Sequence, residues 1–204
     1  MLPSKKVVFT GQAINTEMFY PTSRIESKKL RFLYIGRIAP VKNIARAVEA
    51  LGMLEKSSWS REWSFSIVGG PLLKEDYKYH DFLKDLVRKE RFEKKINFLG
   101  PKPYSEIPAI MREHDFLINM SQTGSLDKTV LEAMASGLTV LTSTEGYKNV
   151  LPERYFLQDG NPYSAAERIK LLSEERRPNL SLRDIVVKNH SLGATIDKIT
   201  QIIL

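Results

Sequence analysis

The segment between residues 115 and 142 restricts the fold of this chain more than any other. An apolar run at residues 116–120 is followed by a turn of mostly small and polar residues at 121–127. Gly137 suits the end of a helix, and a second apolar run follows it. Between the turn and this glycine, apolar residues recur at helical spacing: Leu131, Met134, Ala135 and Leu138. The segment predicts a buried strand, a tight turn, a helix and a further strand.

The predicted turn has the features of an anion site. The first N–H groups of a helix lack partners within the helix, and the positive end of its dipole points the same way. Gly124 lets the backbone turn tightly and approach a ligand. Asp127, or Ser125 before it, can cap the helix. We therefore expect an anionic ligand at the turn formed by Ser125, Leu126, Asp127, Lys128 and Thr129.

Glu132 lies in the second turn of this predicted helix. Helical side chains lean back toward the N-terminus, so its carboxylate can reach a ligand bound there. A carboxylate that accepts two hydroxyl protons suits a vicinal diol such as ribose. The alternative is a solvated surface residue; small neighbours at residues 133, 135 and 136 suggest close helix packing and favour the functional interpretation.

The remaining chain alternates predicted strands and helices. The strands are expected at residues 30–35, 63–68, 95–99, 116–120 and 138–142, with a short sixth at 154–157. Further helices are expected at residues 43–54, 76–91, 105–112, 161–175, 182–189 and 194–203. This pattern predicts an α/β fold: a doubly wound, Rossmann-like parallel sheet of about six strands with helices on both faces. Glycines end several of these strands, so the loops are expected to converge on one rim of the sheet.

Two cations follow the first predicted strand in the loop GRIAPVK. Arg37 offers a planar fork for phosphate oxygens, and Lys42 offers a mobile point charge. Either alone would be an ordinary solvated cation. Together, at a strand end facing the anion-prone turn, they predict a diphosphate site.

The composition excludes several other classes. The 204 residues suffice for one sizeable core and include no cysteine, so disulfides, thiol nucleophiles and thiolate metal sites are ruled out. The formal charge of +7 favours anionic partners, but interleaved aromatics and a recognised nucleic-acid module are lacking, so no nucleic-acid partner is expected. Neither a Walker motif nor GxGxxG after the first strand occurs, and the three histidines lack metal-ligand spacing. No signal peptide or long apolar span is recognised, which fits a cytoplasmic protein.

The motifs, taken in order, resemble a known family. The motifs are GR-x4-K after the first strand, VGG after the second, FLG after the third and GSLDKTVLEAMASGLTVLTS. They are similar to the C-terminal half of a retaining, GT-B-fold glycosyltransferase of family 4, or group 1. The segment GQAINTEMFYP resembles the family's interdomain connection. On this basis residues 1–29 are an interdomain lead-in, and residues 30–204 are a nucleotide-sugar-binding domain.

The resemblance implies roles for individual residues. Arg37 and Lys42 would bind the donor diphosphate and stabilise the departing charge, and Glu132 would bind the ribose. Backbone at residues 125–128 would contact phosphate or sugar, and Pro101, in the loop after the third strand, would lie by the base. The resemblance also implies hexosyl transfer in polysaccharide biosynthesis without a metal cofactor, because fixed cations and helix dipoles replace the metal.

Two departures from the family pattern matter. The family commonly carries a Glu eight positions before Glu132, where this chain has Gly124; Asp127 is the nearest carboxylate and serves either as the sugar contact or as a plain helix cap. The family's N-terminal domain, which supplies acceptor contacts, is missing from this sequence. We therefore expect an excised domain or half of a split enzyme, inactive alone, with a glycan or lipid-linked acceptor reached through the other domain. Peripheral membrane contact of the full enzyme stays open.

Other functions stay open at this point. One is a non-catalytic nucleotide- or anion-binding module; another is an epimerase or phosphorylase, which share the GT-B architecture. The sequence names neither the nucleotide base nor the sugar.

Overall fold

The protein folds around one parallel β-sheet, seen in a computed structural model that describes residues 11–23, 29–124, 126–175 and 177–203. The strands are β1 (Leu30–Ile35), β2 (Trp63–Val68), β3 (Ile96–Gly100), β4 (Phe116–Asn119) and β5 (Thr139–Thr142). Their order across the sheet is β3-β2-β1-β4-β5, and all neighbouring pairs are parallel. The predicted Rossmann-like class is confirmed.

The strand order reverses direction between β1 and β4. From β1 the chain moves outward through β2 and β3, then returns to the other side of β1 to form β4 and β5. The loops that leave the carboxyl ends of β1 and β4 therefore run to opposite faces of the sheet. Ligands of open α/β sheets bind at this switch point.

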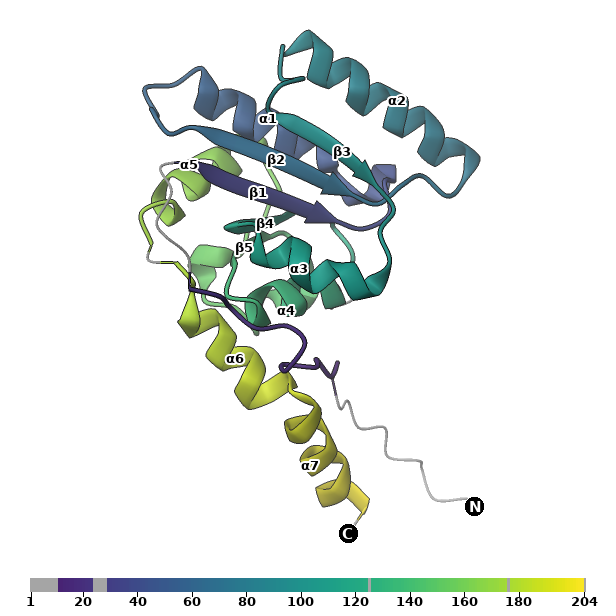
Figure 1. Ribbon diagram of the computed structural model, residues 1–204, viewed down its shortest axis with the longest axis vertical. Helices are drawn as coiled ribbons and strands as arrows, with labels where there is room; N and C mark the ends of the chain where they lie inside the picture. The colour runs from purple at the N-terminus through teal and green to yellow at the C-terminus, as the bar shows by residue number, and fades with distance from the viewer. Residues whose placement is uncertain (1–10, 24–28, 125, 176, 204) are drawn as a thin grey trace.

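The helices cover both faces of the sheet (Figure 1). The α-helices are α1 (Ile44–Glu55), α2 (Lys74–Lys89), α3 (Ile107–Arg112), α4 (Lys128–Ala135), α5 (Pro162–Leu172), α6 (Leu180–His190) and α7 (Leu192–Ile203). Short 3-10 turns are η1 (Pro40–Lys42), η2 (Tyr104–Glu106), η3 (Glu145–Tyr147) and η4 (Glu153–Tyr155). Helix α1 packs with α2 and α5, whereas α4 packs with α6, which continues into α7 away from the sheet (Figure 1).

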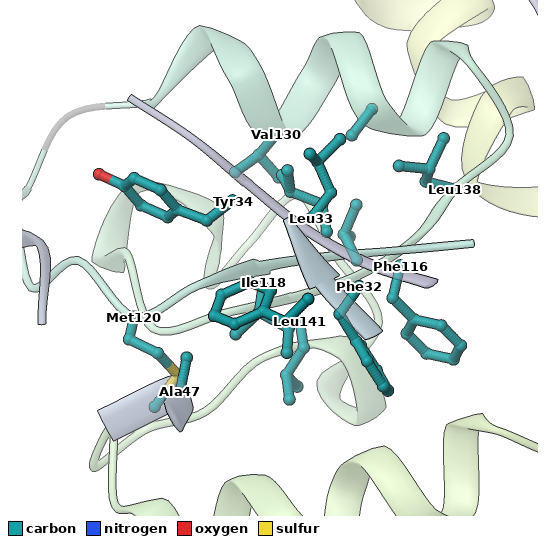
Figure 2. Close-up of a cluster of buried hydrophobic side chains, with 14 of the residues drawn as sticks. Phe32, Leu33, Tyr34, Ala47, Phe116, Ile118, Met120, Val130, Leu138 and Leu141 are labelled. Atoms are coloured by element: carbon teal, nitrogen blue, oxygen red, sulfur yellow. The ribbon is translucent and has the colours of Figure 1, made fainter. Parts of the chain in front are cut away.

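The core lies between these layers. Figure 2 shows side chains of β1 and β4, among them Phe32 and Ile118, between Ala47 of α1 and Val130 of α4. The predicted inner stripe of α4 is fully buried, and β4 and β5 are buried along their whole length. Burial of both sheet faces explains why these strands read as continuous apolar runs.

Within the part of the chain that the structure describes, the sheet has five strands, and the short sixth strand expected at residues 154–157 does not form. Residues Glu153–Tyr155 curl into a 3-10 turn after Pro152. Phe156 then makes a single parallel bridge to Thr142 of β5. Only one residue of the predicted strand therefore pairs with the sheet edge, because the residues before it form the 3-10 turn and cannot join the ladder.

The described part of the lead-in packs against the C-terminal helices. Ile14 forms a bridge with Ser191, and its N–H donates to the His190 carbonyl oxygen at 2.7 Å. Phe19 is fully buried, and the Arg183 guanidinium donates to its carbonyl oxygen at 2.9 Å. Ile14 and Phe19 therefore belong to the hydrophobic core.

None of the helices in the described residues is long and apolar enough to cross a bilayer.

Candidate functional site

The carboxyl ends of β1 and β2 meet backbone to backbone. Gly69 has a φ of +127°, and a Cβ added there would lie 1.9 Å from the Gly36 carbonyl oxygen. The Gly36 N–H donates to the Val68 carbonyl at 3.0 Å, and the Gly69 N–H donates to the Gly100 carbonyl at 2.9 Å. Only glycine fits this approach. The glycines thus hold the loops after three strands together at one rim, as the sequence predicted.

Lys42 reaches across the switch point to Asp127. It ends the η1 turn, after which Asn43 adopts a left-handed conformation (φ 49°) and donates from its side chain to the Met120 carbonyl at 3.3 Å. The Lys42 Nζ lies 3.0 Å from the Asp127 Oδ2. The loops after β1 and β4 are therefore joined by an ion pair, with both side chains about four-fifths buried (21% and 18% exposed).

The buried side-chain amide of Asn119 positions the Asp127 carboxylate. The Asn119 side chain, at the end of β4, donates to Asp127 Oδ2 at 3.0 Å. Asn119 Oδ1 in turn accepts from the Ser121 N–H at 3.1 Å and from the Thr144 hydroxyl at 3.3 Å. Because Asn119 is only 2% exposed, these partners satisfy an amide that would otherwise be costly to bury.

Asp127 occupies the N-cap position of α4, but the predicted side-chain cap is not formed within the described chain. Its carboxylate is held by Lys42 and Asn119 instead, while its backbone carbonyl accepts the Tyr147 hydroxyl at 2.6 Å. The plain helix-cap interpretation of Asp127 is therefore wrong.

Arg37 pairs with a carboxylate at the start of α2. Its side chain is 39% exposed, and its Nε lies 3.7 Å from Oδ2 of the buried Asp76. The Tyr34 hydroxyl donates to the Arg37 carbonyl at 2.8 Å. Burial raises the pKa of Tyr34, and the charges of Asp127 and Arg37 both act on this hydroxyl. The Tyr34 hydroxyl therefore holds the backbone of the loop after β1 at Arg37.

The Asp76 carboxylate binds both Arg37 and the backbone at the start of α2. It accepts the N–H of Leu73 at 3.0 Å and of Leu72 at 3.2 Å. The hydrogen bond from Leu73, then that from Leu72 and the Arg37 charge, lower the pKa of the Asp76 carboxyl despite its burial. The carboxylate thus ties Arg37 to the start of α2.

Glu132 is buried and accepts a hydrogen bond from Tyr104. The Tyr104 hydroxyl donates to Glu132 Oε1 at 2.7 Å, and Lys128 Nζ lies 3.6 Å from the same oxygen. Burial raises the pKa of Glu132, whereas Tyr104 and Lys128 oppose that shift. The solvated-surface alternative for Glu132 is excluded, since the residue is only 4% exposed.

The other predicted site residues lie around this rim. Leu126 is half-buried, and its carbonyl accepts from the Gln12 side chain at 2.7 Å. Pro101 packs by Gly70, where an added Cβ would lie 3.1 Å from its Cγ. Gly124 is exposed and Thr129 is half-buried in the first turn of α4. Ser125 falls outside the described residues.

The structure adds residues that sequence reasoning missed. These are Tyr34, Asp76, Tyr104, Asn119 and Tyr147. One signal was present: Asn119 is a polar residue closing an apolar strand at the rim. Tyr104 and Tyr147 had no such signal, because their contacts reach residues 28 and 20 positions away.

This arrangement suits an anionic ligand that also carries hydroxyl groups. Lys42 and Lys128 supply positive charge at the start of α4, and Glu132 supplies a hydroxyl acceptor behind it. Arg37 adds a third cation on the neighbouring loop after β1, beside the start of α2. Among the described residues, no group of three or more acidic or histidine side chains could hold a metal ion.

Comparison with known proteins identifies the family. The chain matches the family "Glycosyl transferases group 1" over residues 17–190. It is 26% identical over 160 residues to D-inositol 3-phosphate glycosyltransferase of Corynebacterium glutamicum, covering 76% of this chain and 38% of that protein. It is 27% identical over 154 residues to a phosphatidylinositol N-acetylglucosaminyltransferase subunit of Arabidopsis thaliana, covering 74% and 33%. The chain thus spans less than two fifths of the length of these relatives.

Solved structures share the fold. Anabaena HepE, in complex with UDP and glucose, superposes with a TM-score of 0.78 at 16% identity, over 94% of this chain and 55% of that one. The C-terminal domain of a group 1 glycosyl transferase (LpcC) from Francisella tularensis superposes with a TM-score of 0.75 at 19% identity, over 88% of this chain and all of that one. The chain therefore belongs to the group 1 glycosyltransferases and forms the C-terminal, Rossmann-like domain of their GT-B fold.

Proposed function

We propose that this chain is the donor-binding domain of a retaining family 4 enzyme, which transfers a hexosyl group from a nucleotide-diphosphate sugar to a glycan or lipid-linked glycan acceptor. Membership of the group 1 glycosyltransferases supports the class of reaction. Family 4 and retention of configuration rest on the ordered set of motifs from Arg37 to Glu132.

The observation that carries the proposal is the meeting of Lys42 with the start of α4 across the switch point. A diphosphate placed there would meet Lys42, Arg37 and the first N–H groups of the helix. The diphosphate gains charge as the bond to the sugar breaks, so fixed cations would stabilise the leaving group in the transition state. On this proposal the cations do so without a metal.

Glu132 completes the proposed donor site. It lies one helical turn behind the phosphate position, where a ribose attached to the diphosphate would reach it. Pro101 and the backbone of Gly70 would border the base. The first donors to test are uridine nucleotides, because HepE was solved with UDP and with UDP-glucose.

We propose that a second, N-terminal domain supplies the acceptor contacts. The relatives are more than twice as long as the part that this chain matches, which supports a partner domain of comparable size. Alone, the chain would bind donor weakly and transfer little, because a water-excluding cleft needs both domains.

Calorimetry on this chain tests the site. UDP, GDP, ADP and inorganic pyrophosphate would be titrated into the wild type and into the double variant Arg37→Ala/Lys42→Ala. We expect one nucleoside diphosphate to bind and the double variant to lose that binding. The matched control is Lys89→Ala/Lys170→Ala, which removes two exposed cations from α2 and α5 and leaves binding unchanged.

Two outcomes separate the alternatives. Equal affinity of wild type and Arg37→Ala/Lys42→Ala refutes the phosphate site. Tight nucleotide binding combined with no sugar transfer, even when the chain is joined to the N-terminal domain of a relative, favours the non-catalytic binding module.

A further inference from the structure

Tyr104 links three parts of the molecule at the candidate ribose position. It comes from the η2 turn after β3, and its hydroxyl donates to Glu132 Oε1 on α4 at 2.7 Å. Lys128 Nζ donates to the same phenol oxygen at 3.3 Å and lies 5.2 Å from the ring centroid. The buried Phe19 of the lead-in packs edge-on against the ring, with centroids 5.9 Å apart. Tyr104 therefore contacts Glu132, Lys128 and Phe19, although half of the residue is exposed.

The protonation of Glu132 depends on this neighbour. A carboxylate accepts two hydroxyl protons well only when it is ionised, and burial of Glu132 disfavours ionisation by raising its pKa. Of the groups that act on it, Tyr104 and Lys128 favour the charged form and Asp127 disfavours it. Burial and the nearby Glu132 raise the pKa of Tyr104, so its phenol remains a hydrogen-bond donor at neutral pH.

We propose that Tyr104 is a positioning residue for ribose recognition: it donates to Oε1 of Glu132 and so keeps that carboxylate ionised and in one orientation, leaving its other lone pairs for the ribose hydroxyls. This inference rests on the proposed function, because it assumes that Glu132 binds a ribose. Tyr104 acts through Glu132 and needs no contact with the ligand itself. The β3–α3 loop would thereby contribute to discrimination between a nucleoside diphosphate and a bare diphosphate.

The test uses Tyr104→Phe, which removes one hydroxyl and retains the ring that packs on Phe19. The ligands would be pyrophosphate and UDP, or whichever nucleoside diphosphate the wild type binds. Each would be titrated at about pH 5.5 and at about pH 8, because protonation of a carboxyl with a raised pKa increases as the pH falls. We expect roughly a fivefold loss of nucleotide affinity near pH 8 and a larger loss near pH 5.5, because the carboxylate protonates more readily without its donor. Pyrophosphate affinity should not change.

Three variants separate this role from a structural one. Tyr163→Phe, at an exposed tyrosine of α5, is the matched control and should behave as wild type. Glu132→Gln should weaken nucleotide binding, and Tyr104→Phe/Glu132→Gln should lose little more, because both changes act on one carboxylate. Thermal denaturation would check that each variant folds.

The outcomes are distinct. If Glu132→Gln binds the nucleotide as wild type does, the ribose role of Glu132 fails and the proposed function with it. If Glu132→Gln is weak but Tyr104→Phe is unchanged, tighter, or equally affected at both pH values, only the positioning role is overturned. Tighter binding would show that Tyr104 competes with the ribose.

Discussion

The Lys42 Nζ lies 3.0 Å from the Asp127 Oδ2, although the two residues are 85 positions apart in the chain. The pair joins the loops that follow β1 and β4. An incoming anion must therefore share Lys42 with Asp127 or displace the carboxylate. Free and bound forms of the site should differ in this contact.

Asp127→Asn should raise the affinity for inorganic pyrophosphate about threefold, because Lys42 would no longer be partly neutralised by a carboxylate. The Asn side chain can still accept from Asn119 and Lys42, so the loop should keep its shape. Calorimetry at low salt would measure the change. The control is Asp159→Asn, an exposed carboxylate that accepts instead from the Asn161 N–H and the Ser164 hydroxyl. Weaker pyrophosphate binding would contradict this view and show that Asp127 is needed to place Lys42.

Glu132→Gln should make the folded chain more stable at neutral pH. Burial raises the pKa of Glu132, so the folded state favours the neutral carboxyl. The stabilisation is complete below the unfolded pKa of about 4.3 and is lost as the pH rises through the higher folded value. The melting temperature of the variant should therefore be about 2 °C higher than that of the wild type near pH 7. Near pH 4 the two melting temperatures should be the same.

Calorimetric scans across this pH range would check the prediction for Glu132, with Glu167→Gln on the exposed face of α5 as the control. A lower melting temperature of Glu132→Gln at every pH would mean that Tyr104 and Lys128 more than offset the burial of the carboxylate.

Gly69→Ala should destabilise the chain by at least about 3 kcal/mol. The new Cβ would collide with the Gly36 carbonyl oxygen, 1.9 Å away, and the φ of +127° is strained for alanine. Urea denaturation would measure the loss. Gly193→Ala in α7 is the control: among the described residues, no atom outside its own stretch of helix lies within 4 Å of its added Cβ. We expect no loss of stability there. A small effect at Gly69 would show that the β1 and β2 ends separate readily.

Leu131→Ala should cost about 3 kcal/mol, because the side chain is fully buried on the inner face of α4 and its removal leaves a cavity. Leu171→Ala, at a residue of α5 that is 70% exposed, should change stability by less than about 0.5 kcal/mol. The same denaturation experiment compares the two. Equal effects would mean that α4 is not packed on the sheet as described.

Local patterns predicted the elements closely. The helix expected at residues 43–54 is α1 (Ile44–Glu55), and the strand expected at 63–68 is β2 with the same bounds. Both have clear periodicity and clear stop signals. The sixth strand failed because Phe156 alone pairs with β5, and no local pattern distinguishes a single bridge from a short strand.

The candidate site was predictable only in outline. A strand-ending loop with Arg37 and Lys42, and a helix start with Glu132 behind it, had to share one edge once the sheet was parallel. The roles of the predicted residues toward a donor stay predictions. Which partner each side chain takes could not be read locally, and the cap expected at Asp127 was wrong because Lys42 and Asn119 offered stronger partners.

The amino-acid sequence by itself determined the alternation of strands and helices, the edge on which the loops gather, and the charges present there, because each depends on short-range periodicity and on the parallel direction of the strands. Only the tertiary structure decided that Tyr104 covers Glu132, that Asp127 neutralises Lys42 and that Asp76 anchors Arg37. Each of these contacts joins segments that are distant in the chain. The crossing of the sheet at the switch point brings Lys42 to Asp127 and Tyr104 to Glu132, whereas the pairing of β1 with β2 brings Arg37 to Asp76.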